Sequence, residues 1–202
     1  MDDITLLQTL TGLAAGVGLA AACGFRVFLP LLVGGIALRL GALPAQDALA
    51  WLSSTPALIG LGTATALEGV AYYVPWLDNA LDSIATPASV VAGTLAAAAL
   101  LVGVDPFVQW TLATVVGGGA AGTVQLGTVA TRAASTGTTG GAANFLVSTA
   151  EGVGAIALSV VAVVVPVVAF LVVAVVLFFA VRALRRWWIR RAEAGVGQLA
   201  TD

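Results

Sequence analysis

The chain contains no lysine, no histidine and a single cysteine, and only 9% of its 202 residues are charged. Without histidine there is no imidazole base, no Ser-His nucleophile and no usual ligand for a zinc or haem site. One cysteine, Cys23, excludes an internal disulfide and a thiolate metal cluster. A formal net charge of −2 supplies no basic surface for nucleic acid. We therefore expect no cofactor, no metal, no nucleic-acid partner and no enzymatic activity.

Hydrophobic residues make up 60% of the chain, and this predicts an integral membrane protein. A soluble domain has about 25% charged residues, so most of this surface must face the lipid bilayer. The expected fold is all-α: a polytopic transmembrane helix bundle with about six spans, forming a single domain over residues 1–202. The bilayer is the first expected partner, and a homo-oligomer stays open as a second.

The apolar runs place the spans, because a helix needs about 20 apolar residues to cross a bilayer. The first run, residues 6–40, is interrupted near Arg26 and Pro30, so it forms one broken span, a re-entrant hairpin or two spans. We expect a loop at 41–56 and, at 76–84, an amphipathic helix in the headgroup plane. The remaining expected spans are 57–76, 87–104, 107–130, 141–161 and 164–186.

Five of the eight arginines lie at the end of the last expected span or directly after it, between positions 182 and 191. Positive charge beside a span is typical of its cytoplasmic end. We therefore predict a multi-pass protein of the cell membrane with a cytoplasmic tail at 187–202. The side of the N-terminus stays open, because it depends on how the first apolar run crosses the bilayer.

A weak internal repeat relates residues 5–105 to residues 106–186. Residues 12–28 align with 118–134, and Glu-Gly-Val occurs once in each half. Three spans per half would make the repeats inverted, a pattern of transporters that have broken helices and a midplane site. The repeat therefore predicts an arginine at a helix break and a glutamate on a later helix in each half. The matched charged pairs are Arg26 with Arg132 and Glu68 with Glu151.

These four side chains fall within or beside apolar runs, and they are the main candidates for substrate or ion binding. An arginine in hydrocarbon costs roughly 2.5–3.5 kcal/mol on insertion scales, and intramembrane charges are functional candidates by default. The functional interpretation is that the arginines bind an anion, while the glutamates neutralise them or carry a proton. The alternative is structural: snorkelling at span ends, ion pairs or hydrogen-bonded acids that order the bundle.

A second candidate site is the stretch at 131–144, which is rich in glycine and hydroxyl groups. We expect a loop here, followed by a helix near Gly141 whose positive dipole end faces an anion or a polar headgroup. An ordinary solvated loop is the alternative. Besides Arg132, the candidate residues are Ser135, Thr136, Thr138, Thr139 and Asn144. The small-residue motifs Gly12–Gly16 and Gly118–Gly122 are expected to be packing surfaces.

Two segments resemble a known family. They are GFRVFLPLLVGGIALRLG at 24–41 and ALEGVAYYVPWLDNALDSIATPASVVAGTL at 66–95. Both are similar to prokaryotic integral membrane proteins of domain-of-unknown-function family 4126, as is the glycine- and threonine-rich stretch that leads to Asn144 and Glu151. The resemblance covers nearly the whole chain. It implies an integral membrane protein and brings no particular activity.

Three functions stay open at this point. The first is a small transporter or channel, proton-coupled, for an anionic or small polar solute. The second is a carrier or flippase for a lipid headgroup, and the third is a non-catalytic structural or accessory protein. Convergence of the four charged residues on a midplane cavity favours transport, whereas a lateral opening to the bilayer favours the lipid carrier.

Overall fold

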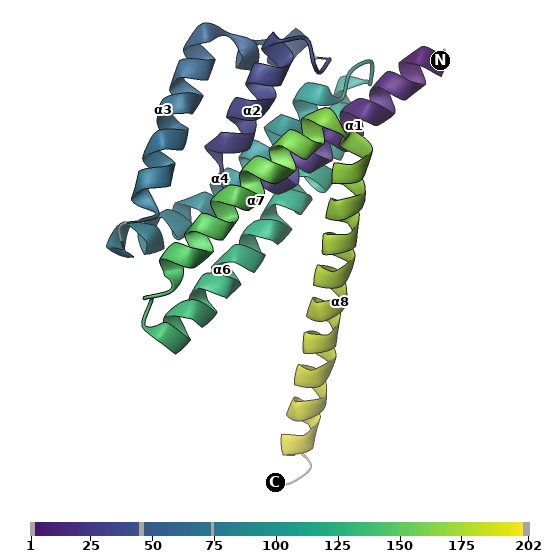
Figure 1. Ribbon diagram of the computed structural model, residues 1–202. Coiled ribbons are helices and arrows are strands. Elements are labelled where there is room, and N and C mark those ends of the chain that lie inside the picture. Colours follow the sequence, from purple (N-terminus) through teal and green to yellow (C-terminus); the bar gives the residue numbers. More distant parts are fainter. Residues whose placement is uncertain (1–2, 45–46, 74, 200–202) are drawn as a thin grey trace.

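The computed structural model describes residues 3–44, 47–73 and 75–199, and within these ranges it contains helices and no strand (Figure 1). This confirms the expected all-α membrane bundle. The elements are α1 (Asp3–Cys23), α2 (Phe28–Arg39), the 3₁₀-helix η1 (Asp47–Ser53), α3 (Thr55–Ala71), α4 (Pro75–Leu100), α5 (Pro106–Leu112), the π-helix η2 (Ala113–Gly118), α6 (Gly119–Thr139), α7 (Asn144–Val164) and α8 (Pro166–Leu199).

Five stretches of the described helices are long and apolar enough to cross a membrane. The third of them is one continuous helical stretch formed by α5, η2 and α6. The span expected at 57–76 corresponds to α3, which is not among these five stretches: its 17 residues are about 26 Å long against a hydrocarbon core of about 30 Å. The five stretches are Leu6–Cys23, Ser83–Leu100, Pro106–Thr139, Asn144–Val164 and Pro166–Ala183.

Residues 6–40 form a helical hairpin that ends inside the bundle. The 12 residues of α2 reach about 18 Å and are too short to cross the hydrocarbon core. The helix folds back on α1, so a Cβ built on Gly34 would lie 3.2 Å from the Leu19 Cδ1 atom. The turn at 24–27 packs against the first two turns of α6, where a Cβ built on Gly24 would lie 2.6 Å from the Val124 Cβ atom. The first apolar run therefore consists of one helix long enough to cross the bilayer, α1, and one shorter helix, α2.

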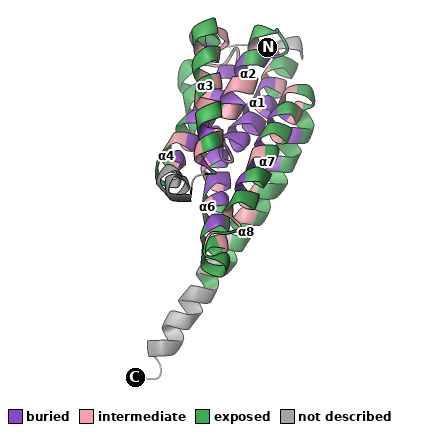
Figure 2. Ribbon diagram, turned by 60° about the vertical axis from the view of Figure 1, so that its left-hand side comes forward, coloured by how far each residue is buried: buried purple, intermediate pink, exposed green. Residues whose placement is uncertain are grey.

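Small residues pack α1, η2 and α6 closely against α4, and the buried residues concentrate there (Figure 2). A Cβ built on Gly16 would lie 3.0 Å from the Ala97 Cα atom, and one on Gly118 would lie 2.7 Å from the Thr94 Oγ1 atom. The two small-residue motifs are thus confirmed as packing surfaces, which is how small residues act between membrane helices.

The prediction of a separate amphipathic helix at 76–84 is wrong. Residues 75–100 form the single helix α4, which contains Pro87. An amphipathic surface helix and a buried span share the same 3.6-residue period, so the spacing of apolar residues does not mark a boundary between them. Proline is tolerated within membrane helices because neighbouring groups satisfy the freed backbone.

The loop expected at 131–144 is confined to the turn at 140–143, because α6 continues to Thr139 and α7 begins at Asn144. The hydroxyls of Thr131, Thr138 and Thr139 donate to carbonyl oxygens four residues earlier, at 2.7–2.9 Å. Hydroxyl groups satisfied in this way remain compatible with a helix. The helix ends at two glycines in the left-handed region, with φ of +64° at Gly140 and +88° at Gly141.

Two expected boundaries are confirmed. The break expected between the spans 141–161 and 164–186 lies at Val165, directly before Pro166, and separates α7 from α8. Asp105 starts the next helix as a capping residue, because one of its carboxylate oxygens accepts from the Phe107 amide at 2.9 Å. The tail expected from residue 187 continues the helix α8, which extends beyond the rest of the bundle (Figure 1).

Candidate functional site

The four candidate charged residues meet in one buried cluster. Arg26 lies in the turn between α1 and α2, Glu68 near the end of α3, Arg132 within α6 and Glu151 within α7. All four are more than nine-tenths buried, with exposed fractions of 4–7%. Charges buried among spanning helices require partners or a polar cavity, so the contacts of each side chain decide what the cluster does.

The residue at the centre of the cluster is Tyr72, directly after α3. The guanidinium carbon of Arg26 lies 3.9 Å from the centroid of its ring, and that of Arg132 lies 4.3 Å away. Each contact is a cation–π interaction. The sequence reasoning missed Tyr72. The sequence position of Tyr72 could have indicated it as a site residue. It follows Glu68 by four residues, about one helical turn, and together with Tyr73 it forms the chain's only pair of tyrosines.

Arg132 and Glu151 form a buried ion pair between α6 and α7. The Arg132 Nε–H donates to Glu151 Oε1 at 3.1 Å, and the Nη2–H donates to Oε2. This fork-to-carboxylate geometry satisfies both carboxylate oxygens. The prediction that this arginine lies at a helix break is wrong, because α6 is continuous around it.

The carboxylate of Glu68 binds the N-terminus of α2. Its Oε1 accepts from the Val27 amide at 2.7 Å, and its Oε2 accepts from the Phe28 amide at 3.2 Å. The first amides of a helix lack partners within the helix, and the helix dipole places partial positive charge there. A side chain from α3 therefore occupies the position at which a helix N-terminus binds an anion.

Arg26 is satisfied on one side only. Its Nη2 donates to the Ser148 carbonyl of α7 at 2.7 Å. Its Nη1 is buried and has no hydrogen-bond partner among the residues that the structure describes. A buried charged donor without an acceptor is costly. This nitrogen is therefore the atom of the cluster at which an added acceptor would be stabilised.

A cavity of about 250 Å³ lies beside Arg26, between the hairpin turn, α3 and α7. We call it the Arg26 cavity. Its polar edge includes the Tyr73 hydroxyl, which is 3.0 Å from the Thr149 hydroxyl. Polar and apolar groups thus share the lining of a small space, and one of the lining residues, Arg26, has an unsatisfied donor. The lining residues are Arg26, Leu29, Thr65, Glu68, Gly69, Tyr73, Ser148, Thr149, Gly152, Val153 and Ile156.

A second, larger space lies on the other side of α7. A cavity of about 640 Å³ between α6, α7 and α8 includes Glu151 in its lining, and an adjoining apolar cavity of about 360 Å³ lies between α1, α7 and α8. We call the two together the α6–α8 groove. They share Phe25, Val124, Gly154 and Val176. The groove is mostly apolar, in contrast to the Arg26 cavity.

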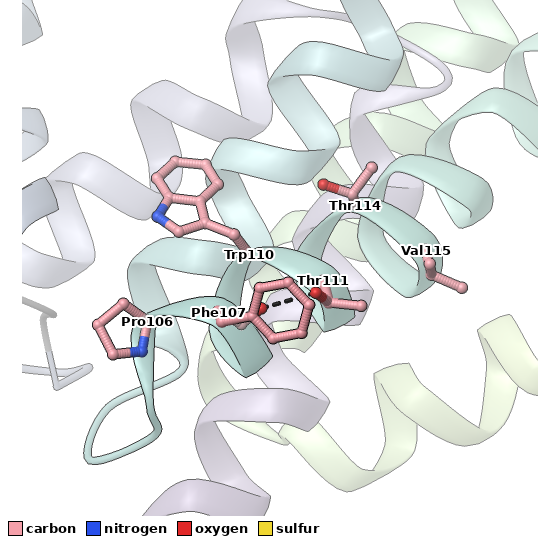
Figure 3. A pocket seen from close by; sticks show the side chains of 6 residues that line it. All are labelled: Pro106, Phe107, Trp110, Thr111, Thr114 and Val115. Carbon is pink, nitrogen blue, oxygen red and sulfur yellow. Dashed lines mark hydrogen bonds between the residues drawn. The ribbon is translucent and has the colours of Figure 1, made fainter.

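A third concave surface, of about 610 Å³, lies along α5 and η2 (Figure 3). All its lining residues belong to one helical stretch, 106–115. Phe107 is 79% exposed, and its carbonyl accepts from the Thr111 hydroxyl within the same helix. Aromatic residues on one face of a span are typical of a lipid-facing surface. With no polar groups converging from a second element, this surface is no candidate site.

The second set of candidate residues lies at the far end of α6 and in the turn to α7. Thr136, Thr138 and Thr139 are exposed, and the Asn144 side-chain amide donates to the Thr136 hydroxyl at 3.1 Å. Ser135 lies between them and Arg132 on the same helix. None of these five residues lines the Arg26 cavity or the α6–α8 groove.

The model of a domain-of-unknown-function family, DUF4126, matches residues 13–186. The chain belongs to this family. Comparisons with curated proteins and with solved structures give no match. The range matched by the DUF4126 model contains both arginines and both glutamates of the cluster. The family description assigns no activity, so the function of this DUF4126 protein has to be argued from the site.

Proposed function

We propose that the protein is a small membrane transporter or channel for an anionic solute, and that Arg26 binds this solute. The observation that carries the proposal is the buried Nη1 atom, which has no acceptor within the described part of the chain and belongs to a residue that lines a cavity. An unsatisfied buried donor costs about 1–3 kcal/mol, and more when it is charged. A bound anion would supply the missing acceptor.

The size of the cavity favours a small solute. Its volume of about 250 Å³ lies below the roughly 300–1,000 Å³ of pockets for drug-sized ligands. A planar guanidinium matches the geometry of a carboxylate, so short carboxylates are the first candidates. Intramembrane charges beside cavities mark solute pathways in many membrane proteins, and the hairpin of α1 and α2 adds the discontinuous helices typical of transporters.

Proton coupling is part of this proposal, and Glu68 is the residue that we assign to it. Glu68 lines the same cavity as Arg26, so its protonation would remove a negative charge that repels an anion. Glu151 bonds Arg132 through both carboxylate oxygens. We therefore assign Glu151 to the structure of the bundle.

We also propose that the halves 5–105 and 106–186 are inverted repeats that move against each other during transport. The support is that the aligned residues Arg26 and Arg132 both bond residues of α7 and share the Tyr72 ring. A site at the junction of two repeats is the usual position in this architecture.

The test is flux of formate and chloride into proteoliposomes. Arg26→Gln should lower the flux at least tenfold at equal incorporated protein. The matched control is Arg39→Gln at the other end of α2, where the side chain is exposed and bonds the Thr55 hydroxyl; its flux should stay near that of the unaltered protein. Equal flux in the two variants, or no flux above empty liposomes in the unaltered protein, would overturn the proposal.

The same assay at two pH values tests proton coupling. Glu68→Gln should abolish the dependence of flux on pH. An unchanged pH dependence in Glu68→Gln would remove Glu68 from the mechanism and leave anion transport itself in place.

A lipid-headgroup carrier is the second candidate, and the α6–α8 groove favours it. The groove has apolar walls and a polar end at Thr128, Thr131 and Glu151, and it is bounded by α8, whose span is mostly exposed. A flipping assay with labelled phospholipid in the same liposomes separates the two functions. Lipid flipping without anion flux would replace the transporter by the carrier.

A further inference from the structure

Two positive elements belong to the turn beside the Arg26 cavity. The first is the N-terminus of α2, whose amides at Val27 and Phe28 bond the Glu68 carboxylate. The second is the Nη1 atom of Arg26, the residue directly before these amides, which is buried without an acceptor in the described residues. Helix N-termini bind anions, and half-helices inside a membrane protein point their N-termini at anionic substrate groups.

The Glu68 carboxylate therefore occupies the two amides, while a third donor of the same turn, Arg26 Nη1, has no acceptor among the described residues. The Glu68 side chain comes from α3, about 40 positions along the chain, so it can leave the site while the turn itself stays intact. The cavity beside it provides space for this movement. We infer that the Glu68 carboxylate is a tethered anion, which fills the binding site when it is empty and is displaced by a small carboxylate during transport.

This inference rests on the proposed function and adds the substrate class and the regulation of the same site. The substrate class follows from replacement: a ligand that takes the place of the Glu68 carboxylate accepts from the two adjacent amides of Val27 and Phe28, next to the positive charge of Arg26, as a carboxylate does. Short carboxylates fit the cavity volume of about 250 Å³.

A permanent helix cap is the competing interpretation, and the chain contains one for comparison. Asp105 accepts from the Phe107 and Val108 amides at the start of α5. Asp105 is exposed and precedes its helix directly, as ordinary capping residues do. Glu68 differs from it in three respects: it is buried, it comes from another helix, and it lines a cavity together with Arg26, whose Nη1 atom has no acceptor among the described residues.

Chemical rescue tests the inference without measuring transport. Glu68→Ala should lower the thermal midpoint of the protein in detergent micelles, because it removes the cap and leaves both amides and Arg26 unsatisfied. Added sodium formate should restore the midpoint in a saturable manner, since a ligand that binds only the folded state stabilises it in proportion to ln(1 + [L]/Kd). Glu68→Gln keeps the shape and loses the charge, so formate should stabilise it less.

Two control variants define the site. Asp105→Ala removes an exposed cap, and its midpoint should respond to formate no more than that of the unaltered protein. Glu68→Ala combined with Arg26→Gln should lose the rescue. The inference is overturned if formate fails to stabilise Glu68→Ala, or if it stabilises Asp105→Ala equally, because Glu68 would then be a permanent cap.

Flux provides a second readout if Glu68→Ala does not fold. A neutral side chain competes less with formate, so Glu68→Gln should lower the KM for formate flux at least threefold, and an unchanged KM would contradict the inference. The two proposals fail separately. Flux that depends on Arg26 without rescue retains the proposed function alone, whereas rescue without flux retains the anion site and removes transport.

Discussion

Removal of either partner of the Arg132–Glu151 ion pair should strongly destabilise the protein. The perturbations are Arg132→Gln, Glu151→Gln and the double variant. Neither side chain is more than 6% exposed, and two hydrogen bonds join them. Each single variant leaves an uncompensated buried charge or donor set, and breaking a buried pair in this way costs about 3–5 kcal/mol.

The double variant separates the pair interaction from the cost of desolvation. It removes both charges, so its destabilisation should be smaller than the sum of the two single values. Interaction energies between residues in direct contact run to about 0.5–3 kcal/mol, and we expect the upper part of that range because both groups are buried. Loss of the Arg132 contact with Tyr72 adds about 0.5–2 kcal/mol to the variants that lack Arg132.

The measurement is unfolding in mixed micelles with increasing sodium dodecyl sulfate, followed by circular dichroism. Arg39→Gln is the control, since it changes an exposed arginine and should shift the free energy of unfolding by about 0.5 kcal/mol or less. Single-variant losses below about 1 kcal/mol that also add without an interaction term would refute the reasoning. The pair would then be hydrated and would not hold α6 against α7.

Two further predictions concern packing and orientation. Gly93→Ala should destabilise the protein by about 1–3 kcal/mol, because the new Cβ would lie 2.5 Å from Ala121 Cβ and 3.0 Å from the Gly117 oxygen. The control is Gly62→Ala, which faces open space and should be neutral or stabilise the protein by up to about 1 kcal/mol. Equal losses of stability in the two variants, measured in the same unfolding assay, would contradict this packing. The arginines at 182–191 predict a cytoplasmic C-terminus. A reporter that is active only in the cytoplasm should therefore be active when it is fused to the C-terminus. Activity of a periplasm-specific reporter at this end would contradict the predicted orientation.

Apolar runs predicted the class of fold because burial in lipid depends on composition over many residues. The boundary at Pro166 was found for a local reason, since proline interrupts the helical hydrogen-bond pattern. The extent of α6 was missed because glycine, serine and threonine are frequent in loops, while their fit in a membrane helix depends on hydroxyls that bond their own backbone. Whether such a segment forms a loop or a helix depends on its environment and cannot be predicted from its composition.

Scarcity of charge identified the four residues of the cluster, and tertiary packing decided their partners. Arg132 and Glu151 lie 19 positions apart and are joined by the turn between α6 and α7. Arg26 reaches the Ser148 carbonyl across 122 positions, a contact that no local pattern encodes. Tyr72 was missed because an aromatic residue in an apolar chain is ordinary until two guanidinium groups are placed on its ring.

The two halves contain the same charged residue types and use them differently, and the continuity of one helix explains why. In the second half the helix around Arg132 is unbroken, so its amides are satisfied internally and Glu151 is available to the arginine. In the first half the chain breaks at Arg26, and the start of α2 presents amides that take Glu68 instead. The break therefore gives the first half more donors than acceptors. A ligand that carries negative charge should bind there, and the second half should hold the bundle together.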